Sequence, residues 1–156
     1  MQIRLAKTPE DLRNMIMMGA EAAAESPALS RFKYNPERMW NSVLAKLKAA
    51  PKRYGLLIAE LDGKPTGMLA AQVGPHLFVD ALAAQCLVFY VHPDHRGGLT
   101  AAKLLKGYQR WAGQLDCDTM AVHVTTGQRM ETTDRMLKKM GFAQTGGNYE
   151  KGVAGK

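Results

Sequence analysis

Two adjacent glycines, Gly97 and Gly98, mark the part of this sequence whose residues could do chemistry. They follow Arg96, an apolar run (86–91) precedes them, and a segment with helical periodicity comes after them. This order predicts a strand, a loop and a helix in direct succession. The first N–H groups of a helix lack partners within it and lie at the positive end of its dipole. The pattern is therefore typical of a phosphate site, although glycines also occur at ordinary strand–helix junctions.

Charged and titratable side chains surround this loop. His92 and His95 lie in the turn before it, where they either face phosphates or belong to an ordinary solvated turn. The helix that follows is amphipathic, with its basic residues opposite its apolar ones. These cations either attract the phosphates of a ligand or form a solvated face: Lys103, Lys106 and Arg110.

A strand and a helix must hold such a loop, and the sequence supplies them as one unit. The stretch from Gln85 to Ala112 contains the apolar run, the loop and the helix, and Met120 to Thr125 alternates as a further strand. Two strands joined through a helix form a crossover between parallel neighbours. The loop is thus expected at the carboxyl end of a central strand.

Before this unit, each of two helices begins with a capping residue followed by proline. Asp62 and Gly63 suit a type I′ turn and predict a hairpin. The basic and aromatic loop 27–34 either receives a substrate or packs on the domain. The elements expected here are a strand, two helices and two strands: 1–6, 9–24, 36–50, 54–61 and 66–73.

After the crossover, apolar residues recur at helical spacing from Met130 to Met140, and Gly141 ends this helix. The tail from Phe142 to Val153 alternates enough to predict a final hairpin or edge strand. The order is strand, helix, helix, three strands, helix, strand, helix, strand. Because the sequence shows no repeat or linker, residues 1–156 are expected to form a single domain.

The composition is that of an ordinary globular protein, with 46% hydrophobic and 22% charged residues. No apolar run is long enough to span a bilayer, and the N-terminus lacks the apolar part of a secretion signal, so we expect a cytoplasmic protein without a membrane partner. Cys86 and Cys117 lack the spacing of metal ligands and are expected to be reduced. The formal charge of +7 favours an anionic partner: a phosphorylated cofactor, an acidic protein or a nucleic acid.

The residues VHPDHRGGLTAAKLL, followed later by MLKKMGF, together with the order of the elements, resemble the GNAT (GCN5-related N-acetyltransferase) family of acyl-CoA-dependent N-acyltransferases. Within it the chain is most similar to the small GNAT-like proteins that phages and prophages encode. The resemblance implies an α/β fold, with a mixed central sheet of about six to seven strands flanked by about four helices.

The resemblance also implies a site for acetyl-CoA. The family's loop pattern is Gln or Arg, two residues, Gly, one residue, then Gly or Ala, and it maps to Arg96, Leu99 and Ala101. Leu99 stands where the family usually has glycine, and we expect Gly97 and Gly98 to supply the missing flexibility. The implied coenzyme A ligands are main-chain groups of the strand end, for the pantetheine, and of the loop, for the pyrophosphate: Phe89, Tyr90 and Val91, then Arg96, Gly97, Gly98, Leu99, Thr100 and Ala101.

The usual acid and base of the family are both replaced. Gln85 stands where many members have glutamate and cannot accept a proton at neutral pH, although it can orient a water. Leu137 stands where members often have the tyrosine that protonates the departing thiolate. Replacement candidates are His123 and Tyr149, which are otherwise a core or cleft-wall histidine and an edge-strand aromatic. Further candidates are His76, Asp80 and Glu25.

The resemblance implies acetyl transfer from acetyl-CoA to an amine by direct attack in a ternary complex, with a strand N–H near Val91 aimed at the thioester oxygen. The acceptor is a protein lysine or N-terminus, an aminoacyl-tRNA or a small amine. The alternative is a catalytically weak or inactive relative that binds acyl-CoA or a host or partner protein. A nucleic-acid-binding module is disfavoured because no binding motif is present. Family members often form homodimers through their last strands.

Overall fold

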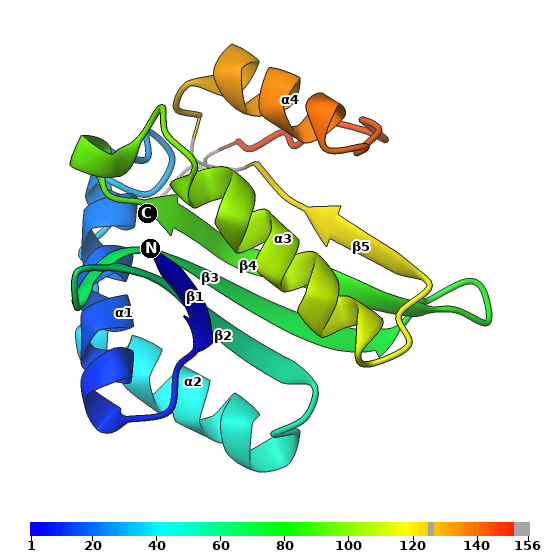
Figure 1. The fold of residues 1–156 in the computed structure, drawn as a ribbon, viewed down its shortest axis with the longest axis horizontal. Helices are drawn as coiled ribbons and strands as arrows, with labels where there is room; N and C mark the ends of the chain where they lie inside the picture. Colours follow the sequence, from blue (N-terminus) through cyan, green and yellow to red (C-terminus); the bar gives the residue numbers. More distant parts are fainter. Residues whose placement is uncertain (125–126, 152–156) are drawn as a thin grey trace.

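The computed structural model describes residues 1–124 and 127–151. Figure 1 shows its elements along the chain: β1 (Gln2–Leu5), α1 (Pro9–Glu25), α2 (Pro36–Ala49), β2 (Tyr54–Leu61), β3 (Lys64–Pro75), β4 (Leu82–Val91), the short 3-10 helix η1 (Pro93–His95), α3 (Thr100–Gly113), β5 (Thr119–Val122) and α4 (Met130–Lys139). None of the described helices is both long and apolar enough to cross a membrane.

The strands form one mixed sheet in the order β1-β2-β3-β4-β5. All neighbours are antiparallel except β4 and β5, which are parallel and joined through α3 as predicted. Helices α1 and α2 cover one face of the sheet, and α3 lies on the other (Figure 1). The α/β class and the four flanking helices are confirmed.

The predicted number of strands was wrong, because the sheet of the described residues has five strands rather than six or seven. Residues 142–151 contain no strand, and nearly all of them are exposed. Gly146, Gly147 and Asn148 favour turns over strands, and the tail has too few apolar side chains to bury a face. The ends of two predicted strands, Thr125 and Val153, lie outside the described residues.

Local signals in the sequence set the boundaries of the first elements. Thr8 caps α1 by accepting a hydrogen bond from the backbone N–H of Asp11 at 3.1 Å, and Asn35 caps α2 in the same way. The hairpin between β2 and β3 turns at Asp62 and Gly63, whose φ angles are +51° and +76°. Both residues take the left-handed conformation that a type I′ turn needs.

Two clusters of buried side chains hold the layers together, one on each face of the sheet. Leu104, Leu105 and Tyr108 of α3 are fully buried against one face. Met15 and Ile16 of α1 are buried against the other, together with side chains of β2 and β3. The sheet therefore forms a rigid layer whose edges and strand ends remain available for a site.

An ion-pair network joins the first strand to its neighbours. Arg4 of β1 contacts Asp11 at the start of α1 and Glu60 of β2, both at 2.8 Å. Asp11 also accepts the backbone N–H groups of Lys7 and Thr8. Hydrogen bonding from Arg4 holds the pKa of the Asp11 carboxyl well below its usual range.

Candidate active site at the end of the central strand

The central strand β4 separates from its parallel neighbour halfway along its length. Ala83 to Cys86 pair with Thr119 to Val122, and β5 ends there. At the same point the register with β3 shifts: Ala71 pairs with Cys86 and Ala70 with Val88, which leaves Leu87 as an extra residue in β4. From residue 88 to 91 the edge of β4 that faces away from β3 has no strand partner among the described residues. Figure 1 shows β5 and α4 diverging from the end of β4.

The loop after β4 presents a row of free backbone donors. Gly97 adopts φ +84°, and α3 begins at Thr100, with the first helical bond running from the N–H of Lys103 to the carbonyl of Leu99 at 2.9 Å. In the described structure the N–H groups of residues 97–102 donate to no protein acceptor. They lie at the positive end of the α3 dipole, an arrangement that binds phosphate. Leu99 is 67% exposed, so its side chain extends into solvent and does not pack on the protein.

The side chain of Arg96 points into the protein. Its Nε donates to the carbonyl of Val91 at 2.7 Å, and its Nη2 donates to Oε2 of Glu25 at 2.6 Å. The guanidinium also lies over the ring of Tyr90, 5.4 Å from its centroid. Arg96 therefore anchors the loop to the end of β4 and to α1. Its backbone N–H also donates to the carbonyl of Pro93 at 3.2 Å, so the donors open to a ligand begin at Gly97 rather than at Arg96, as the resemblance had implied.

Glu25, proposed above as a proton carrier, is a structural hub in this arrangement. Its backbone carbonyl accepts a hydrogen bond from Nε2 of Gln128 at 2.9 Å, while its carboxylate binds Arg96. The hydroxyl of Tyr90 lies 3.0 Å from Glu21 and 3.3 Å from Glu25. Burial raises the pKa of Tyr90, and its side chain faces α1. No local pattern in the sequence signals these contacts, since they join residues far apart in the chain.

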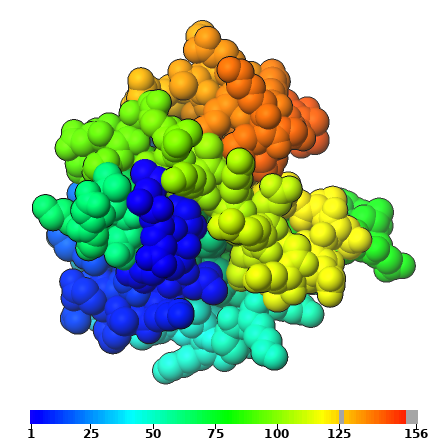
Figure 2. Space-filling model, viewed as in Figure 1, coloured from blue at the N-terminus to red at the C-terminus, as the bar shows by residue number. Residues whose placement is uncertain are grey.

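A groove of about 440 Å³ opens between α3 and α4, beside the free amides. Figure 2 shows residues of α4, in orange, next to the beginning of α3, in green. Two of the lining side chains are basic, which suits an anionic ligand. The lining residues are Ala102, Thr132, Arg135, Met136, Lys139 and Met140.

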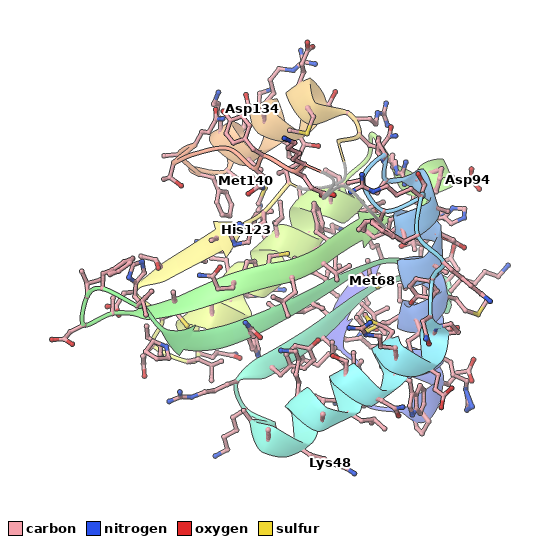
Figure 3. All side chains as sticks on the ribbon, turned by 180° about the vertical axis from the view of Figure 1, so that it is seen from behind. Lys48, Met68, Asp94, His123, Asp134 and Met140 are labelled. Atoms are coloured by element: carbon pink, nitrogen blue, oxygen red, sulfur yellow. The ribbon has the colours of Figure 1, made fainter. Side chains whose placement is uncertain are left out.

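Two of the predicted catalytic residues meet where β4 and β5 part. Nε2 of His123 lies 2.7 Å from Oε1 of Gln85, and His123, labelled in Figure 3, follows directly after the end of β5. Gln85 is half-buried and His123 is exposed. The contact fits the imidazole tautomer protonated at Nε2, which leaves Nδ1 as a proton acceptor.

Other predicted candidates lie elsewhere. Tyr149 is 98% exposed on the tail and has no contact with Gln85 or His123 among the described residues. His76 and Asp80 are exposed in the connection between β3 and β4, at the opposite end of β4 from the loop. The three cations of α3, Lys103, Lys106 and Arg110, are exposed on its solvent side.

In the described residues, the remaining titratable groups form no second candidate site. Burial raises the pKa of the Cys86 thiol to about 12, and both cysteines are free. The described residues contain no cluster of metal-ligating side chains.

Comparison with known proteins agrees with this geometry. A family model described as "Acetyltransferase (GNAT) family" matches residues 20–142. A search of curated proteins found no match.

Solved structures show the same fold at low sequence identity. Ribosomal-protein-alanine N-acetyltransferase from Brucella melitensis biovar Abortus 2308 is 18% identical, with a TM-score of 0.72 over 98% of this chain and 100% of that one. The aminoglycoside 6'-N-acetyltransferase AAC(6')-IG from Acinetobacter haemolyticus is 19% identical, with a TM-score of 0.70 over 98% and 99%. AAC(6')-Iy, solved with the bisubstrate analogue CoA-S-monomethyl-acetylneamine, is 19% identical, with a TM-score of 0.74 over 97% and 98%. Since the family model covers most of the sequence, this chain belongs to the GNAT family of acetyltransferases.

Proposed function

We propose that this chain is an acyl-CoA-dependent N-acyltransferase that transfers an acetyl group from acetyl-CoA to an amine by direct attack in a ternary complex. The observation that supports this best is the unpaired edge of β4 (88–91) leading into the free N–H groups of residues 97–102. An extended ligand with amide groups can pair with the strand edge, and its phosphates can bind at the start of α3.

The residues present fit coenzyme A. At the unpaired edge of β4, Phe89 offers its N–H and carbonyl to pantetheine amides and Val91 offers its N–H, and residues 97–101 offer donors to a pyrophosphate. The carbonyl of Val91 already accepts from Arg96, and the main chain of Tyr90 faces β3. The groove beside α4 gives room for the rest of the cofactor, with Arg135 and Lys139 at its wall. When bound, acetyl-CoA supplies the activated thioester.

Gln85 and His123 are placed to prepare the amine. An alkyl ammonium of the lysine type has a pKa of about 10.4 in water, so the acceptor must lose a proton before it attacks. Gln85 holds the imidazole through Nε2, and Nδ1 of His123 takes the proton directly or through a water. Six residues of strand separate Gln85 from Val91, about 20 Å, so Val91 is too far from His123 to serve the same thioester. A backbone N–H at the beginning of the unpaired stretch 88–91 lies nearer and is the one expected to stabilise negative charge on the thioester oxygen.

The test compares thiol release from acetyl-CoA, over a panel of amines, for the native protein and three variants. We expect His123→Ala to lower kcat by about 100-fold at neutral pH and Gln85→Ala by about tenfold, because proton transfer contributes this much to catalysis. Calorimetry should show unchanged affinity for acetyl-CoA in both. His76→Ala, at the far end of β4, is the control and should keep full activity. Normal turnover in His123→Ala would refute its role.

A second candidate, a relative that binds acyl-CoA or a partner protein without efficient catalysis, is favoured by one observation. Leu137 replaces the expected acid, and Tyr149 lies away from the Gln85–His123 pair. Tight acetyl-CoA binding without thiol release would support this candidate. Absence of acetyl-CoA binding to folded protein at millimolar concentration would contradict both.

A further inference from the structure

A row of polar side chains crosses the face of the sheet that carries α1 and α2. Gln72 of β3 and Gln85 of β4 are register partners, and Gln85 pairs in turn with Ala121 of β5, two residues before His123. Partners in register project to the same face with Cβ atoms about 5 Å apart. At one end of the row lies the Gln85–His123 contact, and at the other Nζ of Lys46 donates to Oε1 of Gln72 at 3.0 Å. We call Lys46, Gln72, Gln85 and His123 the polar row.

This row lies on an open part of the sheet. Figure 3 shows the face from behind, with α2 along one side, β5 and His123 on the other, and no described helix crossing the strip between them. Gln72 and Gln85 are half-buried, so their amide groups border this strip. A face of an antiparallel sheet is normally either apolar and covered by another element, or polar and exposed to solvent. Here two ordered contacts fix its polar groups.

Lys46 is held at one end by two interactions although it is exposed. Besides its bond to Gln72, the ammonium lies 5.8 Å from the ring centroid of the buried Tyr54, the register partner of Gln72. In the described part of the chain no carboxylate pairs with this ammonium. Its charge is therefore fixed in place and uncompensated, which favours an anionic group at this end of the row.

We propose that the polar row is the acceptor subsite and that it selects an amine bearing a carboxylate or phosphate, read by Lys46, at the end opposite His123. This inference rests on the proposed acyl transfer and names its substrate class. Two strand spacings separate β3 from β5, so the anionic group and the amine lie about 10 Å apart. The amine end then meets the imidazole beside the point where β4 and β5 part.

Matched acceptors test this selection. Triglycine, whose amine and carboxylate lie roughly 10 Å apart when extended, is compared with triglycinamide. A second pair, 6-aminohexyl phosphate and 6-aminohexanol, separates recognition of phosphate from that of carboxylate. We expect at least one anionic member to be preferred about tenfold in kcat/KM, mainly through KM, with the preference falling as salt screens the charge.

Lys46→Gln should reduce this preference to about twofold or less, because an amide cannot supply the charge. Lys48→Gln, two residues further along α2 and exposed, is the matched control and should keep the preference. Equal rates for both members of both pairs in the native protein, or an undiminished preference in Lys46→Gln, would overturn the inference.

Direct binding separates this inference from the proposed activity. The native protein and Lys46→Gln are titrated with triglycine and 6-aminohexyl phosphate in the absence of coenzyme A, and binding is followed by NMR at the His123 ring. Binding lost in Lys46→Gln, without any acetyl transfer, would uphold the subsite and refute the acyltransferase. Acetyl transfer without a preference for anionic acceptors would support the acyltransferase and refute the subsite.

Discussion

Gly97 and Gly98 look interchangeable in the sequence but differ in their backbone requirements. Gly97 has φ +84°, in the region that side chains with a Cβ rarely adopt, whereas Gly98 does not have a left-handed φ. A Cβ at either position would meet no atom within 4 Å. The difference between them is therefore backbone strain alone, which for a residue other than glycine costs about 1–2 kcal/mol.

Gly97→Ala should weaken binding of acetyl-CoA by about 5- to 30-fold, because the strain opposes the loop conformation that directs the free amides outwards. Gly98→Ala is the matched control and should lose less affinity. Calorimetric titration of both variants with acetyl-CoA measures the difference. A greater loss in Gly98→Ala would show that the left-handed turn is not what shapes the site.

Single residues were easier to predict than the contacts between them. Gln85 and His123 were recognised separately, one from its position relative to Val91 and the other as a titratable residue on a neighbouring strand. Their contact depends on the register of β4 and β5, which tertiary packing sets over only four pairs. The roles of Arg96 and Glu25 were missed for the same reason, since their ion pair joins α1 to a loop remote in sequence.

At the scale of elements, α1 braces the loop that follows β4. The carboxylate of Glu25 holds Arg96, and Glu21, one helical turn earlier, reaches only the hydroxyl of Tyr90. These two glutamates allow the brace to be tested apart from the general negative charge of the helix.

Glu25→Gln should reduce affinity for acetyl-CoA about fivefold, since a partly exposed ion pair contributes up to about 1 kcal/mol. Glu21→Gln, which removes the same charge without touching Arg96, should change it less than twofold. Binding measured at low salt checks both. If the two variants behaved alike, the brace would have no part in ordering the loop.

The elements themselves followed from local signals, and the exceptions have a physical cause. Capping residues, the Asp-Gly turn and helical periodicity predicted the four helices and the hairpin. The extra residue Leu87 in β4 leaves no mark in the sequence, because a bulge changes which face later residues occupy without changing their types. The tail was predicted as a strand from weak alternation, but its glycines favour turns, and residues 142–151 form no strand.

At the scale of the whole molecule, the Arg4–Asp11–Glu60 network ties together three segments that form the first edge of the domain. Asp11 is 5% exposed and its pKa is lowered by Arg4. A carboxyl whose pKa is lower in the folded state stabilises the fold fully above its unfolded pKa of about 3.9. That contribution is lost as the pH falls further, through the folded value.

Asp11→Asn should lower the free energy of unfolding by about 2 kcal/mol at pH 7, less than the roughly 3–5 kcal/mol for a fully buried pair because Arg4 is 30% exposed. The difference from the native protein should shrink below about pH 4, where Asp11 begins to lose its advantage. Urea unfolding across pH 2 to 7 measures it, with the exposed Glu10→Gln as control. A difference that stayed constant down to pH 2 would contradict the assignment.

The early parting of β4 and β5 also bears on how easily a second chain could pair with the edges of the sheet. An exposed strand edge invites another chain to add to the sheet, and short edges limit this risk. Both outer strands, β1 and β5, are only four residues long. The unpaired stretch of β4 lies inside the sheet, where the diverging β5 restricts the approach of a second protein strand. The fold thus leaves unpaired backbone groups of β4 open to an extended ligand, while the short outer strands offer other proteins little edge for strand pairing.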